Sequence, residues 1–572
     1  MSLDRLTDEQ RAAVVATAPV RVILAGAGAG KTTTLVEVIA SLVLDRGRSP
    51  DAIAALSFTR NAAGELRDRV MARIGPAAAA IAFGTSHAFA LRIVRDGSSW
   101  LGLPPWVMVW DEEDEADVIR WVAKERRITQ GALREALAYQ RGALAPRSMM
   151  SPLLHVDAAE QVIGIMRTNG AIGFDDILPL ALRVIRDGPV HLRDRWRYRA
   201  RYLIVDEYQD TAESEVRLFN VLAPAERVVV GDANQNLYAF RGTSPVYLEE
   251  AALNGAAFKV TQCWRSGPSI VGFANRVVEA NATPAQVVLR PNQIADRVEV
   301  LRVDPAQPLP FVIALRAAFN NGLRSVAILC RTNRGAAEAA AIVHDAGMPG
   351  RMLTTDRPFY AHPMVRAVHD AMKIRLGSRD VSLERRVCRQ FLHREYSLAE
   401  AQGITFKAIG EDKRIIDVLA WEGLRWPGDL VPFAVAAIEK LMAIATDAHV
   451  EGRLAPLARL RTMIEEFQSA FPEATMQDYV DHIAGREFLA MRKPKHAKPT
   501  IDVGTVHAAK GLEWDSVFLW GFDEGLMPLR SGEIDEERRV AYVGITRART
   551  QLVCVVTDLP SHLLEFACDN TI

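Results

Sequence analysis

The chain has 572 residues, of which 49% are hydrophobic and 24% are charged, a composition typical of folded proteins with several domains. Its 69 basic and 70 acidic residues leave a net charge of -1, so a nucleic-acid surface would have to be local. The five cysteines are scattered without a C-x-x-C pair, which argues against a disulfide framework and against a cysteine metal site.

A phosphate-binding loop is predicted near the amino terminus. Residues 20–43, VRVILAGAGAGKTTTLVEVIASLV, have the pattern of an apolar strand, a glycine-rich turn and a helix. Three glycines let backbone N–H groups turn toward an anion: Gly26, Gly28 and Gly30. We expect Lys31 to reach the terminal phosphates of a nucleotide and Thr32 to bind magnesium. The generic pattern opens with glycine where this chain has Ala25, and a turn without a ligand is the alternative.

A mainly helical segment is expected next. Helix-period patterns fill much of the region before residue 197, including DEEDEADVIRWVAKERR at 111–127. The segment 191–202, HLRDRWRYRARY, interleaves arginines with aromatic residues. It could be an edge that follows phosphates, or a solvated face before a buried strand, and the sequence leaves both interpretations open.

Two acids end the following strand pattern, LIVDEYQD at 203–210. Ligands of open parallel sheets collect at the carboxyl ends of the strands. We expect Asp206 to orient a magnesium ion that bridges the terminal phosphates, and Glu207 to polarise the water that attacks the γ-phosphate. Alone, the two acids favour a solvated strand end. Together with the phosphate loop, they favour a nucleotide site.

A further apolar strand, RVVVGDANQNLYAFRG at 227–242, ends at Asp232 and is followed by Gln235. An uncharged amide can hydrogen-bond the γ-phosphate or the attacking water. Gln235 would therefore respond to whether ATP or ADP is bound.

Short blocks of sequence complete the pattern from residue 6 to about 556: LTDEQRAAV, AGAGAGKTT, LSFTRNAAGELRDRV, FGTSHAFALRIV, LIVDEYQDT, VVGDANQNLYAFRG, CWRSGPSI, ILCRTN, VGTVHAAKGLEW and EERRVAYVGITRAR. In this order they resemble superfamily 1 DNA helicases of the UvrD/Rep/PcrA type, whose loop also begins with alanine. The resemblance implies an α/β fold of two RecA-like P-loop motor domains, with parallel sheets flanked by helices and a mainly helical insertion in each. The implied ranges are 1–105 and 197–267 for the first motor domain, 106–196 for its insertion, 268–374 and 497–572 for the second motor domain, and 375–496 for its shortened insertion.

The resemblance also implies how ATP is bound. Gln10 would contact the adenine edge and Glu513 the ribose, while Trp264 stands where the family usually has a tyrosine that stacks on the base. Arg265 and Arg547 would act as arginine fingers on the transferring phosphoryl group. The loop itself would comprise Ala25, Gly26, Ala27, Gly28, Ala29, Gly30, Lys31, Thr32 and Thr33.

Single-stranded DNA requires aromatic platforms for bases, with hydroxyls, amides and a few cations for phosphates. By resemblance, the first motor domain would supply Phe58, Thr59, Asn61, Thr85, His87, Tyr238, Phe240 and Arg241. The second would supply Arg331, Asn333, Thr505 and His507. Taken singly, such aromatic or histidine residues more often belong to a core, so the family match carries these assignments.

The function implied is an ATP- and magnesium-dependent DNA helicase or translocase that moves 3′ to 5′ on single-stranded DNA. Expected partners are single/double-strand junctions and proteins of repair, replication restart or recombination. The polar start and the lack of a long apolar run predict a cytoplasmic chain without a membrane partner. An alternative is a DNA-stimulated ATPase that displaces bound proteins, or a motor subunit that does not separate strands. A nucleotide switch or small-molecule kinase would leave Arg547 and the aromatic blocks without a role.

Overall fold

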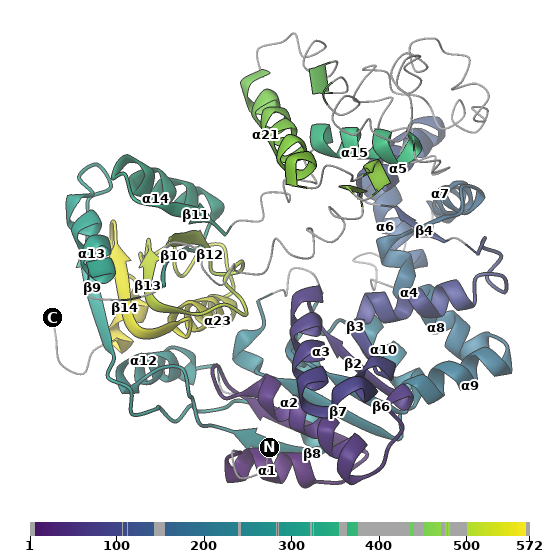
Figure 1. Ribbon diagram of the computed structural model, residues 1–572, viewed down its shortest axis with the longest axis horizontal. Helices are drawn as coiled ribbons and strands as arrows, with labels where there is room; N and C mark the ends of the chain where they lie inside the picture. The colour runs from purple at the N-terminus through teal and green to yellow at the C-terminus, as the bar shows by residue number, and fades with distance from the viewer. Residues whose placement is uncertain are drawn as a thin grey trace. The chain divides into compact units, whose positions relative to one another are not determined.

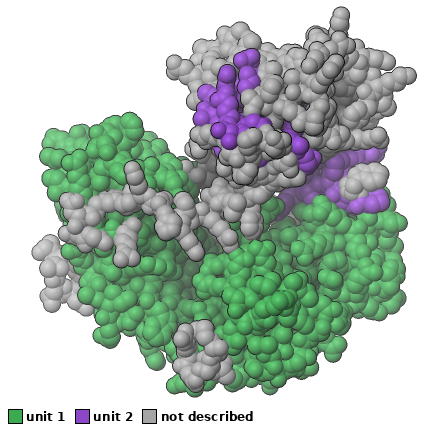
Figure 2. Space-filling view, in the orientation of Figure 1, with its two compact units in different colours: residues 1–102, 177–354, 495–572 green, residues 103–176, 355–494 purple. Residues whose placement is uncertain are grey.

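The structure is a computed structural model, and it describes residues 6–105, 107–110, 112–141, 155–237, 242–281, 283, 285–320, 323, 325–353, 363–375, 435, 438–439, 450–470, 475–477, 479–480 and 500–567. The chain divides into two compact units (Figure 2). Unit 1 comprises residues 1–102, 177–354 and 495–572, and unit 2 comprises residues 103–176 and 355–494. All the predicted site residues that the structure describes belong to unit 1.

Unit 1 contains two sheets (Figure 1), and the first has six strands in the order β3-β2-β6-β7-β1-β8. Their bounds are β1 Val20–Ala25, β2 Ile53–Ser57, β3 Ala82–Thr85, β6 Tyr202–Val205, β7 Glu226–Gly231 and β8 Ala256–Val260. All neighbouring strands are parallel, which brings their carboxyl ends to one edge. The central strands are buried on both faces, which explains their continuous apolar runs.

Helices cover the first sheet. On one face, Ile23, Ile204 and Val230 share a core with three helices: α1 Asp8–Val15, α2 Lys31–Ala40 and α3 Arg60–Ile74. In a second group, α8 packs on α4, α9 and α10. This group comprises α4 Ser86–Asp96, α8 Ile177–Asp187, α9 Val190–Arg199 and α10 Glu213–Leu222, and α11 Val246–Asn254 packs on β1. The first sheet and these helices form the first lobe.

The second sheet also has six parallel strands, in the order β11-β12-β10-β13-β14-β9. Their bounds are β9 Arg297–Arg302, β10 Val326–Cys330, β11 Gly350–Met352, β12 Ile501–Thr505, β13 Trp514–Trp520 and β14 Ala548–Val556. The flanking helices are α12 Pro268–Glu279, α13 Leu309–Asn320, α14 Asn333–Asp345 and α23 Ile534–Ile545. This sheet and its helices form the second lobe.

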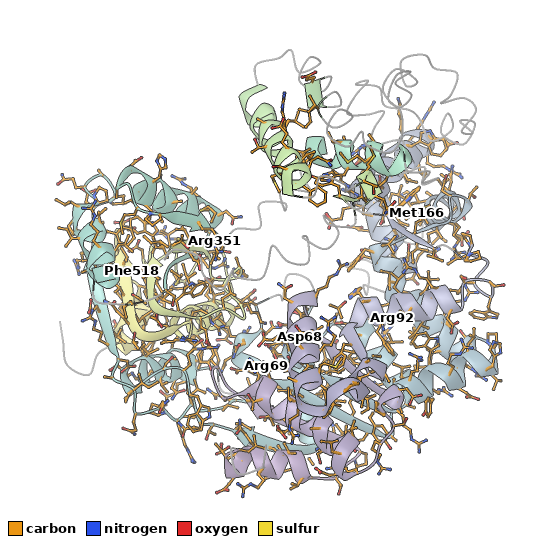
Figure 3. All side chains as sticks on the ribbon, in the orientation of Figure 1. Asp68, Arg69, Arg92, Met166, Arg351 and Phe518 are labelled. Atoms are coloured by element: carbon orange, nitrogen blue, oxygen red, sulfur yellow. The ribbon has the colours of Figure 1, made fainter. Side chains whose placement is uncertain are left out.

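Side chains of the second sheet alternate between two cores, as the period of a strand requires. Ile328 belongs to the core with α13 and α14, whereas Leu329 belongs to the core with α12 and α23. Phe518, which is labelled in Figure 3, lies in the first of these cores. Its ring packs edge to face on the ring of Phe311, with the centroids 5.8 Å apart. The two packed faces make this sheet a rigid support for residues at its carboxyl edge.

Unit 2 is mainly helical among its described residues. Its elements are β4 Met108–Trp110, α5 Glu112–Arg126, α6 Gln130–Gln140, α7 Val156–Thr168, β5 Ala171–Gly173, α15 Pro363–Arg375 and α21 Val450–Ala470. Buried Arg141 ties its first part together, with Nη1 2.7 Å from Glu115 Oε1 and Nε 2.6 Å from Asp176 Oδ1. The insertion predicted at 106–196 extends further than this part of unit 2, because α8 and α9 belong to unit 1.

The basic stretch 191–202 forms α9 and leads into β6. Arg195 Nη1 lies 2.9 Å from Asp96 Oδ1, and the Trp196 ring donates to the same carboxylate at 2.9 Å. The Tyr198 hydroxyl donates to Asp51 at 3.1 Å. These contacts with acids of the first lobe favour the interpretation as a solvated face.

The predicted α/β class is confirmed, since both sheets are parallel and flanked by helices. The second sheet has two separate hydrophobic cores, the first sheet has its own, and unit 2 has a further one, so the long chain folds around several cores. Within the described ranges, no helix has both the length and the apolar character needed to span a membrane.

Candidate functional site

The phosphate loop joins β1 to α2 at the carboxyl edge of the first sheet. Gly28 and Gly30 have φ values of 69° and 81°, in the left-handed region that favours glycine. A Cβ at Gly28 would lie 2.8 Å from Arg265 Cβ, so this position also needs glycine for space. Helix α2 begins at Lys31 without a side-chain cap. Its first amide groups are therefore open to an anion.

Lys31, Asp206 and Glu207 come together beside this loop. Lys31 Nζ lies 3.7 Å from Glu207 Oε2 and is buried without a hydrogen-bond partner among the residues that the structure describes. Burial and the charge of Glu207 raise the pKa of Asp206 to about 7. Against the effect of burial, Lys31 and Lys510 lower the pKa of Glu207 to about 2. The site thus holds one charged carboxylate and a second that a bound cation would ionise.

The backbone at Glu207 is strained. Its φ is 52°, a left-handed conformation that costs a residue with a side chain about 1–3 kcal/mol. The Glu207 amide donates to the Asp206 carboxylate at 2.9 Å, and this local hydrogen bond helps to stabilise the turn after β6. Such strain is often found where a side chain must be aimed at a reaction.

Gln209 links Glu207 to the end of the next strand. Its amide donates to Glu207 Oε2 at 2.5 Å, and its Oε1 accepts the backbone N–H of Asp232 at 3.0 Å. Asp232 Oδ2 accepts the side-chain amide of Gln235 at 2.7 Å. Gln209, Asp232 and Gln235 are all buried. A continuous set of hydrogen bonds therefore joins the predicted γ-phosphate sensor to the predicted catalytic acid.

Arg265 and Glu513 connect the two lobes next to the phosphate loop. Arg265 Nε donates to Glu513 Oε2 at 2.6 Å, and its Nη1 donates to the backbone oxygen of Thr546 at 2.8 Å. Although burial opposes it, the charges of Arg265 and Arg549 lower the pKa of Glu513 to about 2. One predicted arginine finger is thus held by a charged acid from the other lobe.

Arg547 is the second predicted arginine finger, and it is fully buried. Its Nε and Nη1 donate to two backbone carbonyls of its own lobe at 3.0 and 3.1 Å. Burial and Arg265 lower the pKa of Arg547 to about 9, which leaves the guanidinium charged at neutral pH. The negative charge of Glu207 acts in the opposite sense, so Arg547 and Lys31 share this acid as an electrostatic partner.

Gln10 and Trp264 flank the loop. Gln10 Oε1 accepts the Thr7 amide at 3.0 Å, and Gln10 Nε2 donates to Ala29 O at 3.2 Å. The Trp264 amide donates to Gly28 O at 2.9 Å, and the residue is 53% exposed. An exposed indole beside a phosphate loop can stack on a base. The contacts of Gln10 with adenine, of Trp264 with the base and of Glu513 with ribose stay predictions.

Magnesium fits the oxygen donors at this edge. Thr32 lies in the first turn of α2, and Asp206 directly follows β6. A hydroxyl and a carboxylate are hard ligands, and magnesium in nucleotide sites needs few protein oxygens because phosphates and water complete its shell. The described part of the chain has no cluster of three His, Cys, Asp or Glu that could form an all-protein metal site.

Predicted DNA-binding residues of the first lobe lie at the carboxyl ends of two strands: Phe58, Thr59 and Asn61 follow β2, Thr85 is the last residue of β3, and His87 follows it. The ends of these strands are adjacent, because Ser57 pairs with Thr85. Thr59 and Thr85 cap α3 and α4 by accepting first-turn amides at 3.1 and 3.2 Å. The N-termini of α3 and α4 therefore lie at the ends of neighbouring strands, a position that suits phosphate binding. Three further predicted residues lie outside the described residues: Tyr238, Phe240 and Arg241.

The second lobe repeats this arrangement at the ends of two strands: Arg331 and Asn333 follow β10, Thr505 is the last residue of β12, and His507 follows it. Cys330 pairs with Thr505, so these strand ends are adjacent too. Arg331 Nη2 lies 2.7 Å from Oε1 of the buried Glu537. Burial and Arg331 lower the pKa of His507 to about 4, so its imidazole is neutral at pH 7.

Sequence comparison covers both lobes. Residues 6–253 match the UvrD/REP helicase N-terminal domain, and residues 404–558 match the UvrD-like helicase C-terminal domain. The chain belongs to the UvrD-like helicase family. Its two lobes are accordingly the two RecA-like motor domains of that family.

Several curated relatives align with this UvrD-like chain over most of its length. It is 28% identical to ATP-dependent DNA helicase UvrD1 of Mycobacterium tuberculosis, over 96% of this chain and 82% of that protein. It is 26% identical to ATP-dependent DNA helicase PcrA of Bacillus subtilis, over 96% and 82% of the two chains. It is also 26% identical to DNA helicase II of Escherichia coli, over 97% and 85%.

In this UvrD-like chain, Lys510 contacts residues of the predicted ATP site and of the predicted DNA-binding edge. Its Nζ lies 6.0 Å from the centroid of the Phe58 ring, donates to the backbone oxygen of Gln235 at 2.8 Å and pairs with Asp210. Lys510, Gln209 and Tyr542 are not among the residues predicted from the sequence, although all three lie within the matching blocks. That location is their only sequence signal, because each joins segments that are separate in the chain.

Proposed function

We propose that this UvrD-like chain is an ATP-dependent DNA helicase and translocase that moves 3′ to 5′ along single-stranded DNA. The observation that carries the proposal is the position of Glu207, which pairs with Lys31 of the phosphate loop and is electrostatically coupled to Arg547 of the second lobe. A triphosphate held by Lys31 would then be within reach of groups from both lobes. The names of the relatives, all DNA helicases, support the same conclusion.

ATP is the substrate, and the charged groups of the site have complementary tasks. Lys31 and the loop amides bind its phosphates, and Glu207 polarises the attacking water. Gln235 hydrogen-bonds the γ-phosphate or that water. Arg265 and Arg547 offset the charge that spreads over the phosphoryl oxygens. Because these groups come from both lobes, hydrolysis depends on how closely the lobes approach.

Magnesium is the proposed cofactor. Thr32 and Asp206 would hold the ion, which when bound neutralises charge on the terminal phosphates. Asp206 is expected to be ionised next to such a cation, although its pKa is about 7 without one.

The proposed path of the single strand crosses β2 and β3 in the first lobe and β10 and β12 in the second. The N-termini of α3 and α4 lie at this edge, where Thr59 and Thr85 each accept one first-turn amide, and Phe58 supplies an aromatic face. Arg331 supplies a cation in the second lobe. Each lobe would therefore bind the strand separately, and alternating approach and separation of the lobes would move the strand in one direction.

The cellular role proposed is work at single/double-strand junctions in the cytoplasm, during DNA repair, replication restart or recombination, with proteins of those processes as partners. The local polar and aromatic residues at four strand ends support a nucleic-acid partner despite the net charge of -1.

ATP turnover by the purified chain tests the proposal. We expect single-stranded DNA to stimulate it, and Glu207→Gln to lower the stimulated turnover by about 10²–10⁴-fold while DNA affinity is retained. Glu213→Gln is a matched control, because Glu213 is an exposed acid of α10 that pairs with Arg217. Turnover that ignores DNA, or that persists in Glu207→Gln, would contradict the proposal.

A further inference from the structure

Tyr542 is a buried side chain of the second lobe that contacts the phosphate side of the first. It lies on α23, and its hydroxyl donates to Asp232 Oδ2 at 3.2 Å. The hydroxyl oxygen of Tyr542 also accepts the backbone N–H of Ala27, in the phosphate loop, at 3.5 Å. Helix α23 also packs against the short turn Ala233–Gln235. Tyr542 is thus a direct polar contact from the second lobe to the residues that surround the proposed γ-phosphate sensor.

The carboxylate of Asp232 depends on a small set of hydrogen-bond donors. It is fully buried, and its Oδ1 accepts the amide of Asn234 at 3.0 Å. Its Oδ2 accepts two side-chain donors, Tyr542 and Gln235, at 3.2 and 2.7 Å. If Gln235 turns toward a bound triphosphate, Tyr542 is the side chain that still satisfies Oδ2. A buried carboxylate oxygen left without a donor would carry the full cost of its desolvation.

Tyr542 is well suited to this task because it stays a donor. Burial and the nearby charge of Asp232 raise the pKa of Tyr542 well above its ordinary value, so the phenol keeps its proton. Its ring is enclosed in the core of the second lobe, which fixes the direction of the hydroxyl. The position of the hydroxyl therefore follows the position of α23.

We propose that Tyr542 is a positioning residue through which the second lobe sets the γ-phosphate sensor. By holding Asp232, it frees Gln235 to turn toward the triphosphate, while Gln209 keeps the backbone of Asp232 joined to Glu207. The inference rests on the proposed ATP-driven function. It adds a route by which the approach of the second lobe is reported to the catalytic acid.

The same helix connects this contact with the proposed DNA path. Glu537 lies on α23 and pairs with Arg331 at the strand-binding edge. A strand that shifts Arg331 would act on α23, and α23 carries Tyr542. Nucleotide and DNA would then influence one another's affinity by an equal factor, as linkage requires.

Tyr542→Phe tests the inference because it keeps the ring and removes only the hydroxyl. The first readout is the affinity for fluorescent single-stranded DNA, measured by anisotropy with and without a non-hydrolysable ATP analogue. We expect the ratio of the two affinities to move toward one by on the order of ten-fold. The second readout is DNA-stimulated kcat, expected to fall by on the order of ten-fold with KM for ATP changed less than about two-fold.

Tyr202→Phe is the matched control, since Tyr202 is a buried tyrosine of β6 whose ring lies 5.5 Å from the guanidinium of Arg48. It should behave as the wild-type chain in both assays. A wild-type affinity ratio in Tyr542→Phe would overturn the inference and leave the proposed function intact. A wild-type chain without a nucleotide effect or DNA stimulation would overturn the proposed function as well.

Hydrogen exchange of the unmodified chain provides a test that does not depend on the stability of the variant. On binding the ATP analogue, peptides from 226–237 and from 534–545 should gain protection together. Protection confined to 226–237 would overturn the inference, because α23 would then not take part in sensing.

Discussion

Replacing Lys510 by methionine perturbs a defined contact between the lobes. Lys510 pairs with the buried carboxylate of Asp210 and donates to the backbone oxygen of Gln235 at 2.8 Å. Methionine keeps a similar apolar stem but provides neither charge nor donor. Even with Lys510 present, burial raises the pKa of Asp210 from 3.8 to about 6. The variant therefore leaves an acid that is easily protonated and a carbonyl without its donor.

The expected loss of stability follows from these two changes. At pH 7, Asp210 in the variant can avoid an unpaired charge by binding a proton, at a cost of about one pKa unit or about 1.4 kcal/mol. Loss of a charged hydrogen bond adds about 1.5 kcal/mol. In a unit of about 350 residues, an unfolding entropy of about 2.1 cal/mol/K per residue converts about 3 kcal/mol into a melting temperature lower by about 4 °C.

The pH dependence has a definite sign. The folded-state pKa of Asp210 lies above the unfolded value, so bound proton stabilises the folded chain at low pH, and this stability is lost as pH rises through the folded pKa. Without Lys510 this protonation extends to higher pH. At pH 9, protonation of Asp210 in the variant costs about three pKa units, or about 4 kcal/mol. Together with the lost hydrogen bond, this cost should widen the difference in melting temperature from the wild type to about 7 °C.

Calorimetry at pH 7 and pH 9 measures both quantities. The double variant with Lys510→Met and Asp210→Asn should lose the pH dependence, because the titrating group is gone. Lys259→Met, at an exposed lysine of β8, should melt within about 1 °C of the wild type. An equal difference at the two pH values, or a double variant as sensitive to pH as the single one, would refute the reasoning.

Two further predictions concern the DNA path and the phosphate loop. Because His507 is neutral at pH 7, His507→Gln should leave the slope of log affinity for single-stranded DNA against log salt concentration unchanged, whereas Arg331→Gln should reduce the slope by at most about 0.7. DNA titrations at a series of salt concentrations measure both slopes, and equal slopes for the two variants would count against the assignment. Gly28→Ala should weaken binding of a fluorescent ATP analogue far more than Gly47→Ala. Both glycines have positive φ, 69° and 60°, but of the two only Gly28 has no room for a Cβ. Equal affinities of the two variants would show that space in the loop does not matter.

Local features of the fold could be predicted from the sequence because their causes are local. The apolar run before Gly28 and the helix-period residues after Lys31 specify β1, the loop and α2 without help from the rest of the chain. The acids after β6 follow in the same way, since a strand buried on both faces must place charge at its end. For these segments, spacing and residue type were sufficient.

Contacts that depend on folding could not be predicted in this way. The partners of Tyr542 lie directly after β7 and in the phosphate loop, and those of Lys510 lie in the other lobe. No spacing rule relates such positions, because the packing of α23 and of the second sheet decides which side chains meet. Arg195 and Tyr198 of α9 show the same limit, since their partners Asp96 and Asp51 come from elsewhere in the first lobe.

Strand separation by the purified chain is the most direct test of the central claim, that ATP hydrolysis between two lobes drives movement along single-stranded DNA. The measurement compares duplexes with a 3′ tail, a 5′ tail or blunt ends, each with and without ATP and magnesium. The account predicts ATP-dependent separation of the 3′-tailed duplex in preference to the other two. Separation without ATP, or preference for the 5′ tail, would contradict it, and strong DNA-stimulated turnover with no separation at all would favour the alternative of a motor that does not separate strands.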